Sequence, residues 1–303
     1  MRLSRWAGMC SAATIALSAA VIATVVVAPA ASATSVAPTA AVATVAPAPD
    51  WVRSAPNYRY YLSLGDSLGF GYSAANLAKF ETDHNPADFA GYTQILAADL
   101  HLTGSTTNLS CPGESTLTML GVGGKTCPAA NSGYGTWPYS GSQMAAATAF
   151  LKSRPWWDRG LITLSIGAND VLPIAATCLT NPSCPDLAPA LKTMRNNLST
   201  ILGKLRSAAP FATIVVLAPY NPFGHAYPAS NIPAAAVDLS IAAVALLHFD
   251  PVADAFVPIN VNNASTFDCG NLVYFCTSPA NFDVHPTGAG YAVIANAFEA
   301  ALR

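Results

Sequence analysis

Short, continuously apolar runs alternate with helix-like segments along most of this chain of 303 residues. Such runs are typical of buried strands, and the segments between them have the apolar spacing of helices. A parallel sheet covered by helices on both faces produces this alternation, because each strand is then buried on both sides. The sequence therefore predicts one α/β domain, a three-layer α/β/α sandwich with a mainly parallel sheet. The clearest strands are 60–64, 161–166 and 213–217, and the clearest helices are 143–152, 186–208 and 287–302.

Four further segments complete the predicted alternation. Apolar spacing predicts helices over 87–100 and 233–243. Strands are expected over 103–109 and 244–249, the second of them leading into Asp250-Pro251. No internal repeat interrupts this order, so a single globular domain is expected from residue 56 to residue 303.

The N-terminus has the pattern of an export signal. Arg2 and Arg5 precede an apolar, Ala-rich run, and Ala31-Ser32-Ala33 is a small-residue cleavage site. This pattern predicts a signal peptide over 1–33, with a membrane anchor that stays in place as the alternative. An uncharged Ala/Pro-rich linker is expected over 34–55. No later stretch has 18 uninterrupted apolar residues, so no stable membrane span is expected after cleavage, and the mature protein is expected to be secreted.

The charge balance limits the possible partners. Once Arg2 and Arg5 leave with the signal peptide, 12 basic side chains remain against 16 acidic ones, a net charge of about −4. The sequence contains no basic patch, so we expect no nucleic-acid partner.

Six cysteines remain after the signal peptide and its Cys10 are removed. An even number of cysteines in an exported chain indicates disulfides, and six cysteines allow 15 connectivities. Metal binding is disfavoured, because there is no C-x2-C spacing and no His beside the cysteines. No metal and no other cofactor is therefore expected. Proximity alone suggests the pairs Cys111–Cys127, Cys178–Cys184 and Cys269–Cys276.

Ser67 is the first candidate for chemistry. It follows the apolar run of 60–64 and a break at Gly65, so it is expected on a sharp turn where a buried strand ends. Such a turn fixes the backbone and exposes the hydroxyl, as a nucleophile requires. The alternative is an ordinary strand-to-helix turn.

Among five histidines, His285 lies in the loop that opens the last helix, and Pro286 suits that helix start. A base at His285 would reach the strand ends; the alternative is a surface or core histidine.

Four motif blocks follow one another along the chain: Gly65-Asp66-Ser67-Leu68, the segment from Asn108 to Thr116 with Gly113, Gly167-Ala168-Asn169-Asp170, and His285-Pro286. Together they resemble the GDSL, or SGNH, hydrolase family. The resemblance covers about residues 58–303, and the cysteine pairs and export signal resemble its secreted actinobacterial branch. It implies an SGNH-hydrolase-like, flavodoxin-like fold.

The resemblance also implies a role for each block. Ser67 would attack an ester carbonyl, and His285 would take its proton. The backbone N–H groups of Ser67 and Gly113 and the side chain of Asn169 would form the oxyanion hole. An acyl-enzyme would form on Ser67, and water would cleave it.

The acidic residue beside His285 departs from the family pattern. The family usually has an Asp three residues before its His, but Phe282 occupies that position here, and Asp283 is two residues before His285. Side chains two residues apart do not face each other on a helix. Either Asp283 reaches the His285 Nδ1 through a bent loop, or a backbone carbonyl orients the imidazole. Both interpretations remain open at this point.

The same turn also fits a second motif. Gly65-Asp66-Ser67-Leu68-Gly69 matches Gly-x-Ser-x-Gly, the nucleophile elbow of α/β-hydrolases. That fold has several strands before its serine, whereas only a short globular segment precedes Tyr60 here. The position of Ser67 along the chain therefore favours the SGNH-like fold.

These patterns predict a secreted serine esterase or lipase that is monomeric and acts on a small-molecule or lipid ester. A carbohydrate O-deacetylase on the same scaffold is one alternative, because the four blocks do not define the acyl pocket. A non-catalytic surface-binding module is another, although such a module would not need to keep Ser67, Asn169 and His285. Apolar residues over 133–138 and 219–228 could line an acyl groove or could pack within their loops.

Overall fold

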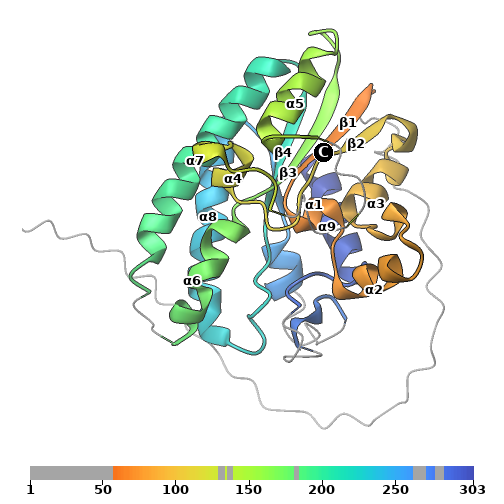
Figure 1. Cartoon of the computed structure of the whole chain (residues 1–303). Coiled ribbons are helices and arrows are strands. Elements are labelled where there is room, and N and C mark those ends of the chain that lie inside the picture. The colour runs from red at the N-terminus through yellow and green to blue at the C-terminus, as the bar shows by residue number, and fades with distance from the viewer. Residues whose placement is uncertain (1–56, 129–133, 135–138, 181–183, 262–270, 277–282) are drawn as a thin grey trace, which may run out of the picture. The chain divides into compact units, whose positions relative to one another are not determined.

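The computed structural model contains one five-stranded sheet in which all strands are parallel, in the order β2-β1-β3-β4-β5 (Figure 1). It describes residues 57–128, 134, 139–180, 184–261, 271–276 and 283–303. The strands are β1 (Tyr60–Gly65), β2 (Thr106–Asn108), β3 (Gly160–Ser165), β4 (Thr213–Ala218) and β5 (Val252–Asp254). The α-helices are α1 (Ser67–Phe70), α2 (Ala74–Asp83), α3 (Tyr92–Asp99), α4 (Thr116–Met119), α5 (Gln143–Lys152), α6 (Ala168–Thr180), α7 (Leu187–Ala208), α8 (Asn231–Leu247) and α9 (Gly288–Ala301).

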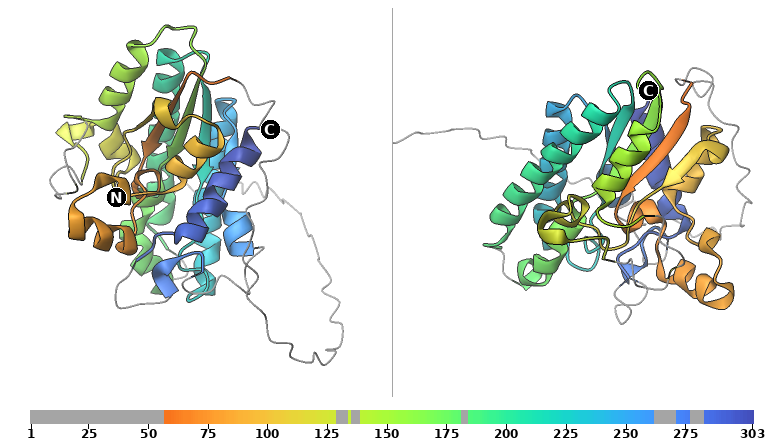
Figure 2. Two further views of the ribbon diagram at one scale, coloured as in Figure 1. Left: turned by 90° about the vertical axis from the view of Figure 1, so that its right-hand side faces the viewer. Right: turned by 45° about the horizontal axis from the view of Figure 1, so that its top comes forward.

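Helices cover both faces of the sheet, as the continuous apolar strands predict. Every residue of β1 and β3 is buried. Because strand side chains alternate between faces, Leu62 and Leu64 pack toward α5, α7 and α8, whereas Tyr61 packs toward α3 and α9. Figures 1 and 2 show these two helical layers on either side of the sheet. The predicted three-layer sandwich is confirmed.

The strand order places a topological switch point between β1 and β3. From β1 the chain goes to β2 on one side of the sheet, and later strands add on the other side through β3. In open α/β sheets of this order, ligands bind at the carboxyl ends of the strands where the direction reverses. Ser67 follows the end of β1 and Asn169 follows the end of β3, so both lie at this point.

The sequence-based prediction was wrong at two boundaries. Residues 244–247, which were expected to begin a strand, are the last turn of α8, and the strand at this edge is β5, Val252–Asp254. An apolar run of this length fits a buried helix end as well as a strand. The helix expected over 87–100 begins only at Tyr92, after a single 3-10 turn at Pro86–Asp88. The strand expected over 103–109 is confirmed as the shorter β2.

Two helices of ten or more residues were not expected from the sequence. The first, α2, carries few buried side chains, so its apolar spacing is faint. The second, α6, contains Pro173, which normally argues against a helix interior. Pro173 lies in the second turn of α6. Both helices lie beside the candidate site, so their absence from the prediction matters for function.

Two of the three expected disulfides are present. Cys111 bonds to Cys127, and Cys178 bonds to Cys184. The third expected pair, Cys269–Cys276, includes Cys269, which is outside the described residues. The predicted signal peptide (1–33) and linker (34–55) are also outside them.

One helical stretch in the described part of the chain, 228–247, is long and apolar enough to span a membrane, judged by length and composition. It contains α8, which packs against α7 and β4 in one of the helical layers. About a third of its most apolar window is buried.

Candidate active site

Ser67 is the first residue of α1, directly after the turn that ends β1. Asp66 caps this short helix: its Oδ1 accepts hydrogen bonds from the Leu68 N–H (3.0 Å) and from the Ser165 hydroxyl (3.1 Å). Burial raises the pKa of Asp66 to about 7, although these two hydrogen bonds act in the opposite direction. The Ser67 N–H lies in the first turn of α1, where helical N–H groups have no partner within the helix.

Gly65 allows this turn to lie tightly against β3. Its φ is +121°, a conformation that residues with a side chain rarely adopt. A Cβ at this position would lie only 1.9 Å from the carbonyl oxygen of Ser165. The strand end, the turn and Ser67 are therefore fixed by backbone geometry.

His285 reaches Ser67 from the opposite end of the chain. Its Nε2 lies 2.9 Å from the Ser67 Oγ. The loop that carries His285 is held by a hydrogen bond from the Tyr274 N–H to the His285 carbonyl oxygen (3.0 Å). Thr287 caps α9 directly afterwards by accepting from the Gly290 N–H (3.2 Å).

Asp283 contacts His285 through a bent loop, the first of the two interpretations left open by the sequence. The Asp283 Oδ1 lies 2.6 Å from the His285 Nδ1 and also accepts from the His285 N–H (3.1 Å). This second bond closes an Asx turn, which brings side chains two residues apart onto one side. The other carboxylate oxygen, Oδ2, accepts from the Ala74 N–H at the start of α2 (2.8 Å).

The surroundings of Asp283 favour its carboxylate form. Partial burial would by itself raise the pKa of Asp283, but the hydrogen bonds from His285 and Ala74 outweigh burial and hold this pKa below its usual value. A carboxylate only accepts hydrogen bonds, so the proton in the bond to His285 belongs to Nδ1. In the neutral imidazole this leaves the His285 Nε2 as an acceptor that faces the Ser67 hydroxyl.

Gly113 and Asn169 lie on the same pocket as Ser67 and His285. This pocket has a volume of about 310 Å³, and Tyr72, Tyr134 and Leu172 also line it. Gly113 has a φ of +80°, and it lies in the loop between β2 and α4. Asn169 lies in the first turn of α6, and its Nδ2 donates one hydrogen bond to the Glu114 carbonyl oxygen (2.9 Å). The structure therefore brings together every site residue proposed from the sequence.

A sequence profile decides the family. The profile of the GDSL-like lipase/acylhydrolase family matches residues 63–293, most of the chain. The chain belongs to this family. It is therefore a carboxylic ester hydrolase, an α/β enzyme of the GDSL/SGNH type. Among curated protein sequences, no match to the chain is found.

Solved structures share the fold of this GDSL-like hydrolase at low sequence identity. An extracellular lipase from Streptomyces rimosus is 20% identical, with a TM-score of 0.54, over 80% of this chain and 98% of that one. Phospholipase A1 from Streptomyces albidoflavus is also 20% identical, with a TM-score of 0.52 and the same coverage. Axe2, an acetylxylan esterase from Geobacillus stearothermophilus, is 14% identical, with a TM-score of 0.51, over 80% and 93% of the two chains.

The sequence analysis did not identify Tyr72, whose ring contacts the imidazole of His285 in this GDSL-like hydrolase. The two ring centroids lie 4.7 Å apart, with the rings in an edge-on arrangement. Tyr72 also lines the pocket. An aromatic residue five positions after the serine has no spacing signal that separates it from ordinary packing residues, so the sequence offered no way to find it.

One group of potential metal ligands lies close to the site. Cys111, Glu114 and Cys127 are buried, and their ligand atoms lie within 4.8 Å of one another. Cys111 and Cys127, however, form a disulfide. Their sulfur atoms are therefore not thiolates, the form in which cysteine binds metals.

A second Ser–His pair lies on the helical layer that contains α7, away from the pocket. The Ser199 Oγ lies 2.9 Å from the His248 Nε2, the same separation as between Ser67 and His285. Ser199 is exposed in the middle of α7, and neither residue lines the pocket. This pair offers a matched reference for experiments on Ser67 and His285.

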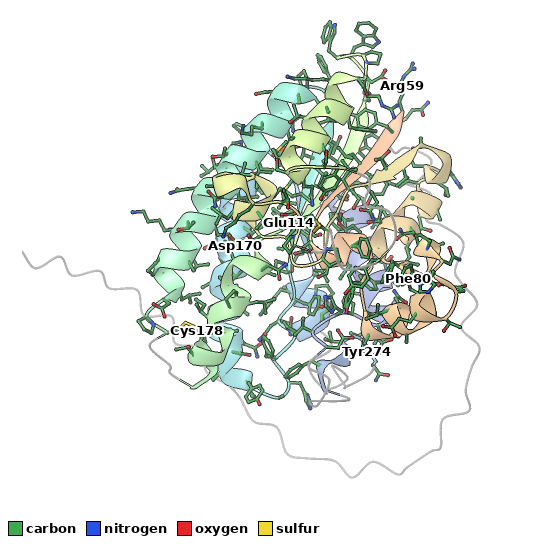
Figure 3. The ribbon with its side chains drawn as sticks, viewed as in Figure 1. Arg59, Phe80, Glu114, Asp170, Cys178 and Tyr274 are labelled. Carbon is green, nitrogen blue, oxygen red and sulfur yellow. A yellow bond between two sulfur atoms is a disulfide. The ribbon has the colours of Figure 1, made fainter. Side chains whose placement is uncertain are left out.

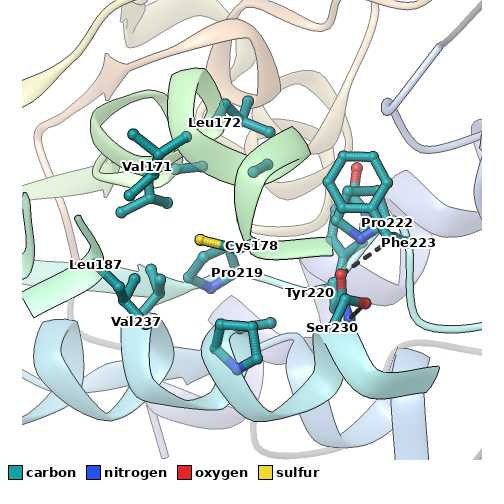
Figure 4. A pocket seen from close by; sticks show the side chains of 16 residues that line it. Val171, Leu172, Cys178, Leu187, Pro219, Tyr220, Pro222, Phe223, Ser230 and Val237 are labelled. Atoms are coloured by element: carbon teal, nitrogen blue, oxygen red, sulfur yellow. Dashed lines mark hydrogen bonds between the residues drawn. The ribbon is translucent and has the colours of Figure 1, made fainter. Parts of the chain in front are cut away.

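A smaller apolar pocket adjoins the first one. It has a volume of about 90 Å³ and lies between α6, α8 and the loop after β4 (Figure 4). Leu172 lines both pockets. Residues 219–223 also line the smaller pocket, so part of the segment 219–228 borders a cavity beside the site. The segment 133–138, also considered for an acyl groove, is outside the described residues except for Tyr134.

Proposed function

We propose that this GDSL-like hydrolase is a secreted serine esterase or lipase that acts through an acyl-enzyme on Ser67. The hydrogen-bonded chain from Asp283 through His285 to Ser67 is the observation that carries this proposal. His285 takes the proton of the Ser67 hydroxyl as the oxygen attacks the ester carbonyl, and then returns it to the leaving alcohol. Asp283 holds the imidazole with its proton on Nδ1.

Three donors stabilise the oxyanion in this proposal. They are the N–H groups of Ser67 and Gly113 and the Nδ2 of Asn169, all of which border one pocket. Asn169 uses one amide hydrogen on the Glu114 carbonyl oxygen, which orients the amide and leaves the other hydrogen for the substrate. A preorganised donor of this kind lowers the barrier by roughly 3 kcal/mol.

The smaller pocket is proposed to receive the acyl chain. Its walls are mostly apolar, and Leu172 connects it to the pocket of Ser67. A volume of about 90 Å³ is smaller than the ~150 Å³ cavity that holds benzene in an engineered protein core. We therefore expect short acyl chains to fit, with longer chains extending toward solvent.

The central experiment measures hydrolysis of p-nitrophenyl esters from acetate to palmitate by the protein and by its Ser67→Ala variant. Loss of the nucleophile is expected to lower kcat by at least about 10⁴-fold. The matched control is Ser199→Ala, which removes the other histidine-bonded serine and is expected to stay within about twofold. Turnover by Ser67→Ala at the original rate would overturn the role of Ser67. Acetyl release from an acetylated polysaccharide, without turnover of any p-nitrophenyl ester, would replace an esterase with a carbohydrate O-deacetylase.

The acyl pocket has its own matched pair of variants on α8. Ala234 lines the smaller pocket, whereas its neighbour Ala235 does not. Ala234→Leu is expected to lower kcat/KM for butyrate and longer esters by about tenfold while sparing acetate, because added methylenes fill the pocket. Ala235→Leu is expected to leave the chain-length profile unchanged. Equal profiles for the two variants would place the acyl chain elsewhere.

Secretion is proposed from three observations. They are the N-terminal pattern over 1–33, the two disulfides and the fold shared with an extracellular Streptomyces lipase. Disulfides persist in oxidising compartments outside the cytoplasm. N-terminal sequencing of protein recovered from the medium of an expressing culture tests this proposal; a mature chain that begins near residue 34 is expected, and a full-length chain retained in cells would contradict it.

A further inference from the structure

Gln143 is a polar side chain buried completely at the first position of α5. Its Oε1 accepts from the Gly65 N–H (2.7 Å), and its Nε2 donates to the Gly65 carbonyl oxygen (2.8 Å). A single side-chain amide therefore pairs with both backbone groups of the residue two positions before Ser67. Only one orientation of the amide satisfies both bonds, so the side chain is fixed.

Glu114 extends this contact to the other two candidate oxyanion donors. The Gln143 Nε2 also donates to the Glu114 Oε2 (3.2 Å). Glu114 directly follows Gly113, and its carbonyl oxygen accepts from the Asn169 Nδ2 (2.9 Å). Glu114 is buried completely as well.

A second contact ties α6 to the same loop. The Asp170 carboxylate accepts from the N–H of Thr116 (2.9 Å) and from its hydroxyl (2.5 Å). Glu114 and Asp170 lie close to each other in Figure 3. The loop that carries Gly113 is therefore joined to the end of β1 on one side and to the start of α6 on the other.

Neither Gln143 nor Glu114 borders the pocket of Ser67. Neither side chain therefore contacts substrate, and both bind backbone that carries oxyanion donors. We propose that Gln143 and Glu114 are a pair of positioning residues that fix the oxyanion donors of Ser67, Gly113 and Asn169 relative to one another. Gln143 then controls the rate of the chemical step from outside the site.

This inference rests on the proposed function, and its main test is Gln143→Met. The substitution keeps an unbranched side chain and removes both amide groups. Because misplacement of donors by about 1 Å can lower a rate about 10²-fold, we expect kcat for p-nitrophenyl butyrate to fall about 10- to 100-fold. KM is expected to stay within about twofold, since the surface that contacts substrate is unchanged.

Gln94→Met is the control for losing a side-chain amide from the first turn of a different helix; Gln94 is exposed, so this variant is expected to cost less stability than Gln143→Met. Gln94 also lies in the first turn of a helix, α3, and its Oε1 accepts from the Gly91 N–H (2.9 Å). This variant is expected to keep its original kcat. If Gln143→Met also keeps its kcat, whatever its melting temperature, the positioning role is excluded.

A double-mutant cycle with Asn169→Ala shows where Gln143 acts. If Gln143 acts through the oxyanion hole, the two effects on kcat overlap, and the double variant loses at least about fivefold less than the product of the single losses. Multiplicative losses would contradict the proposal. If the losses multiply and activity still depends on Ser67, only the positioning role is overturned. If activity does not depend on Ser67, the proposed function is overturned.

Substitutions of Glu114 give an independent check if Gln143→Met does not fold. Glu114→Gln keeps a side-chain oxygen that accepts from the Gln143 Nε2, whereas Glu114→Met removes it. We expect the loss of kcat in Glu114→Gln to be about tenfold smaller than in Glu114→Met, because only the second variant breaks the link. Equal losses in the two variants would show that this hydrogen bond does not position the donors.

Discussion

Two serine–histidine pairs in this protein have the same hydrogen-bond length but different surroundings. Ser67 with His285 and Ser199 with His248 are each separated by 2.9 Å. The nearby carboxylates differ. Asp283 binds the histidine of its own pair, whereas Asp250 binds the Arg206 side chain (2.6 Å). Only the first pair therefore has an imidazole whose tautomer is set by an acidic residue.

The two serines also differ in their backbone setting. Ser67 begins a helix after a buried strand, and it borders a pocket of about 310 Å³ with Gly113 and Asn169. Ser199 lies in the middle of α7, where its N–H is used within the helix, and its side chain is exposed. The comparison teaches that the setting at a strand end, and not the serine–histidine distance, distinguishes the proposed nucleophile Ser67 from a surface serine.

The largest expected difference between the pairs follows removal of the histidine. His285→Ala removes the proposed base beside Ser67, and we expect kcat to fall by about 10⁴-fold or more. His248→Ala is expected to change kcat by less than about twofold. Steady-state kinetics with p-nitrophenyl butyrate measures both values. Similar losses of kcat in the two variants would show that the two serine–histidine pairs do not differ in their effect on catalysis.

The carboxylates provide the next test. Asp283→Asn is expected to lower kcat by about 10²- to 10⁴-fold, because the imidazole loses the partner that fixes its tautomer. Asp250→Asn is expected to leave kcat within about threefold and to lower the free energy of unfolding by roughly 1–3 kcal/mol, since Asp250 is buried but Arg206 is partly exposed. Kinetics and urea unfolding separate the two effects. Near wild-type turnover of Asp283→Asn would exclude Asp283 from catalysis.

Reduction of the disulfides is expected to affect the Ser67 region more than the Ser199 region. Cys111–Cys127 joins two residues 16 positions apart in the chain, next to Gly113. Its loss, in Cys111→Ser with Cys127→Ser, is expected to cost about 3 kcal/mol of stability by loop closure and to lower kcat. Melting temperature and kcat with and without strong reductant provide the measurement. No change in either quantity would show that the bond does not support the Gly113 loop.

The smallest expected effect is on the pH dependence of stability, and it comes from a comparison of two carboxylates with different partners. The hydrogen bonds to Asp283 lower its pKa, whereas burial, followed by the nearby charge of Asp254, raises the pKa of Asp238 on α8 to about 7. Between the usual pKa of an aspartate, 3.8, and about 7, the folded state binds more protons at Asp238 than the unfolded state does, so stability falls as pH rises through this range.

Asp238→Asn removes the loss of stability that Asp238 causes as pH rises. After allowance for partial exposure, we expect the variant to be about 1–2 kcal/mol more stable than the original protein at pH 8 and equally stable near pH 3.5. Urea unfolding at a series of pH values measures the difference. The exposed Asp186, which makes no side-chain cap bond at α7, supplies the control as Asp186→Asn, for which a flat difference is expected. If the stability difference for Asp238→Asn is also independent of pH, Asp238 does not have a raised pKa in the folded protein.

The parts of the site that follow directly from a strand or a helix start could be predicted from the sequence. Ser67 and Asn169 come immediately after apolar strands, and the carboxyl ends of parallel strands meet at one edge of the sheet. His285 could be proposed because it precedes a clear terminal helix. These residues needed only the order of the elements, which local periodicity indicates.

The contact between Asp283 and His285 was one of two interpretations that the same reasoning left open and could not decide. Spacing along a regular helix argues against contact between side chains two residues apart, and the Asx turn that permits it depends on a loop conformation. That conformation is in turn held by the Ala74 N–H, 209 positions earlier in the chain. A single sequence contains no signal for a bond of this range.

The sequence by itself determined the alternation of strands and helices, indicated Ser67 as the candidate nucleophile and, by proximity alone, suggested the cysteine pairs 111–127 and 178–184. Each of these depends on the polarity or proximity of residues close together in the chain. Only the tertiary structure decided that Gln143 binds Gly65 and that Leu172 lines two pockets. The physical reason is that packing decides which distant polar groups are buried together, and a buried group must then find its partner wherever the fold brings one.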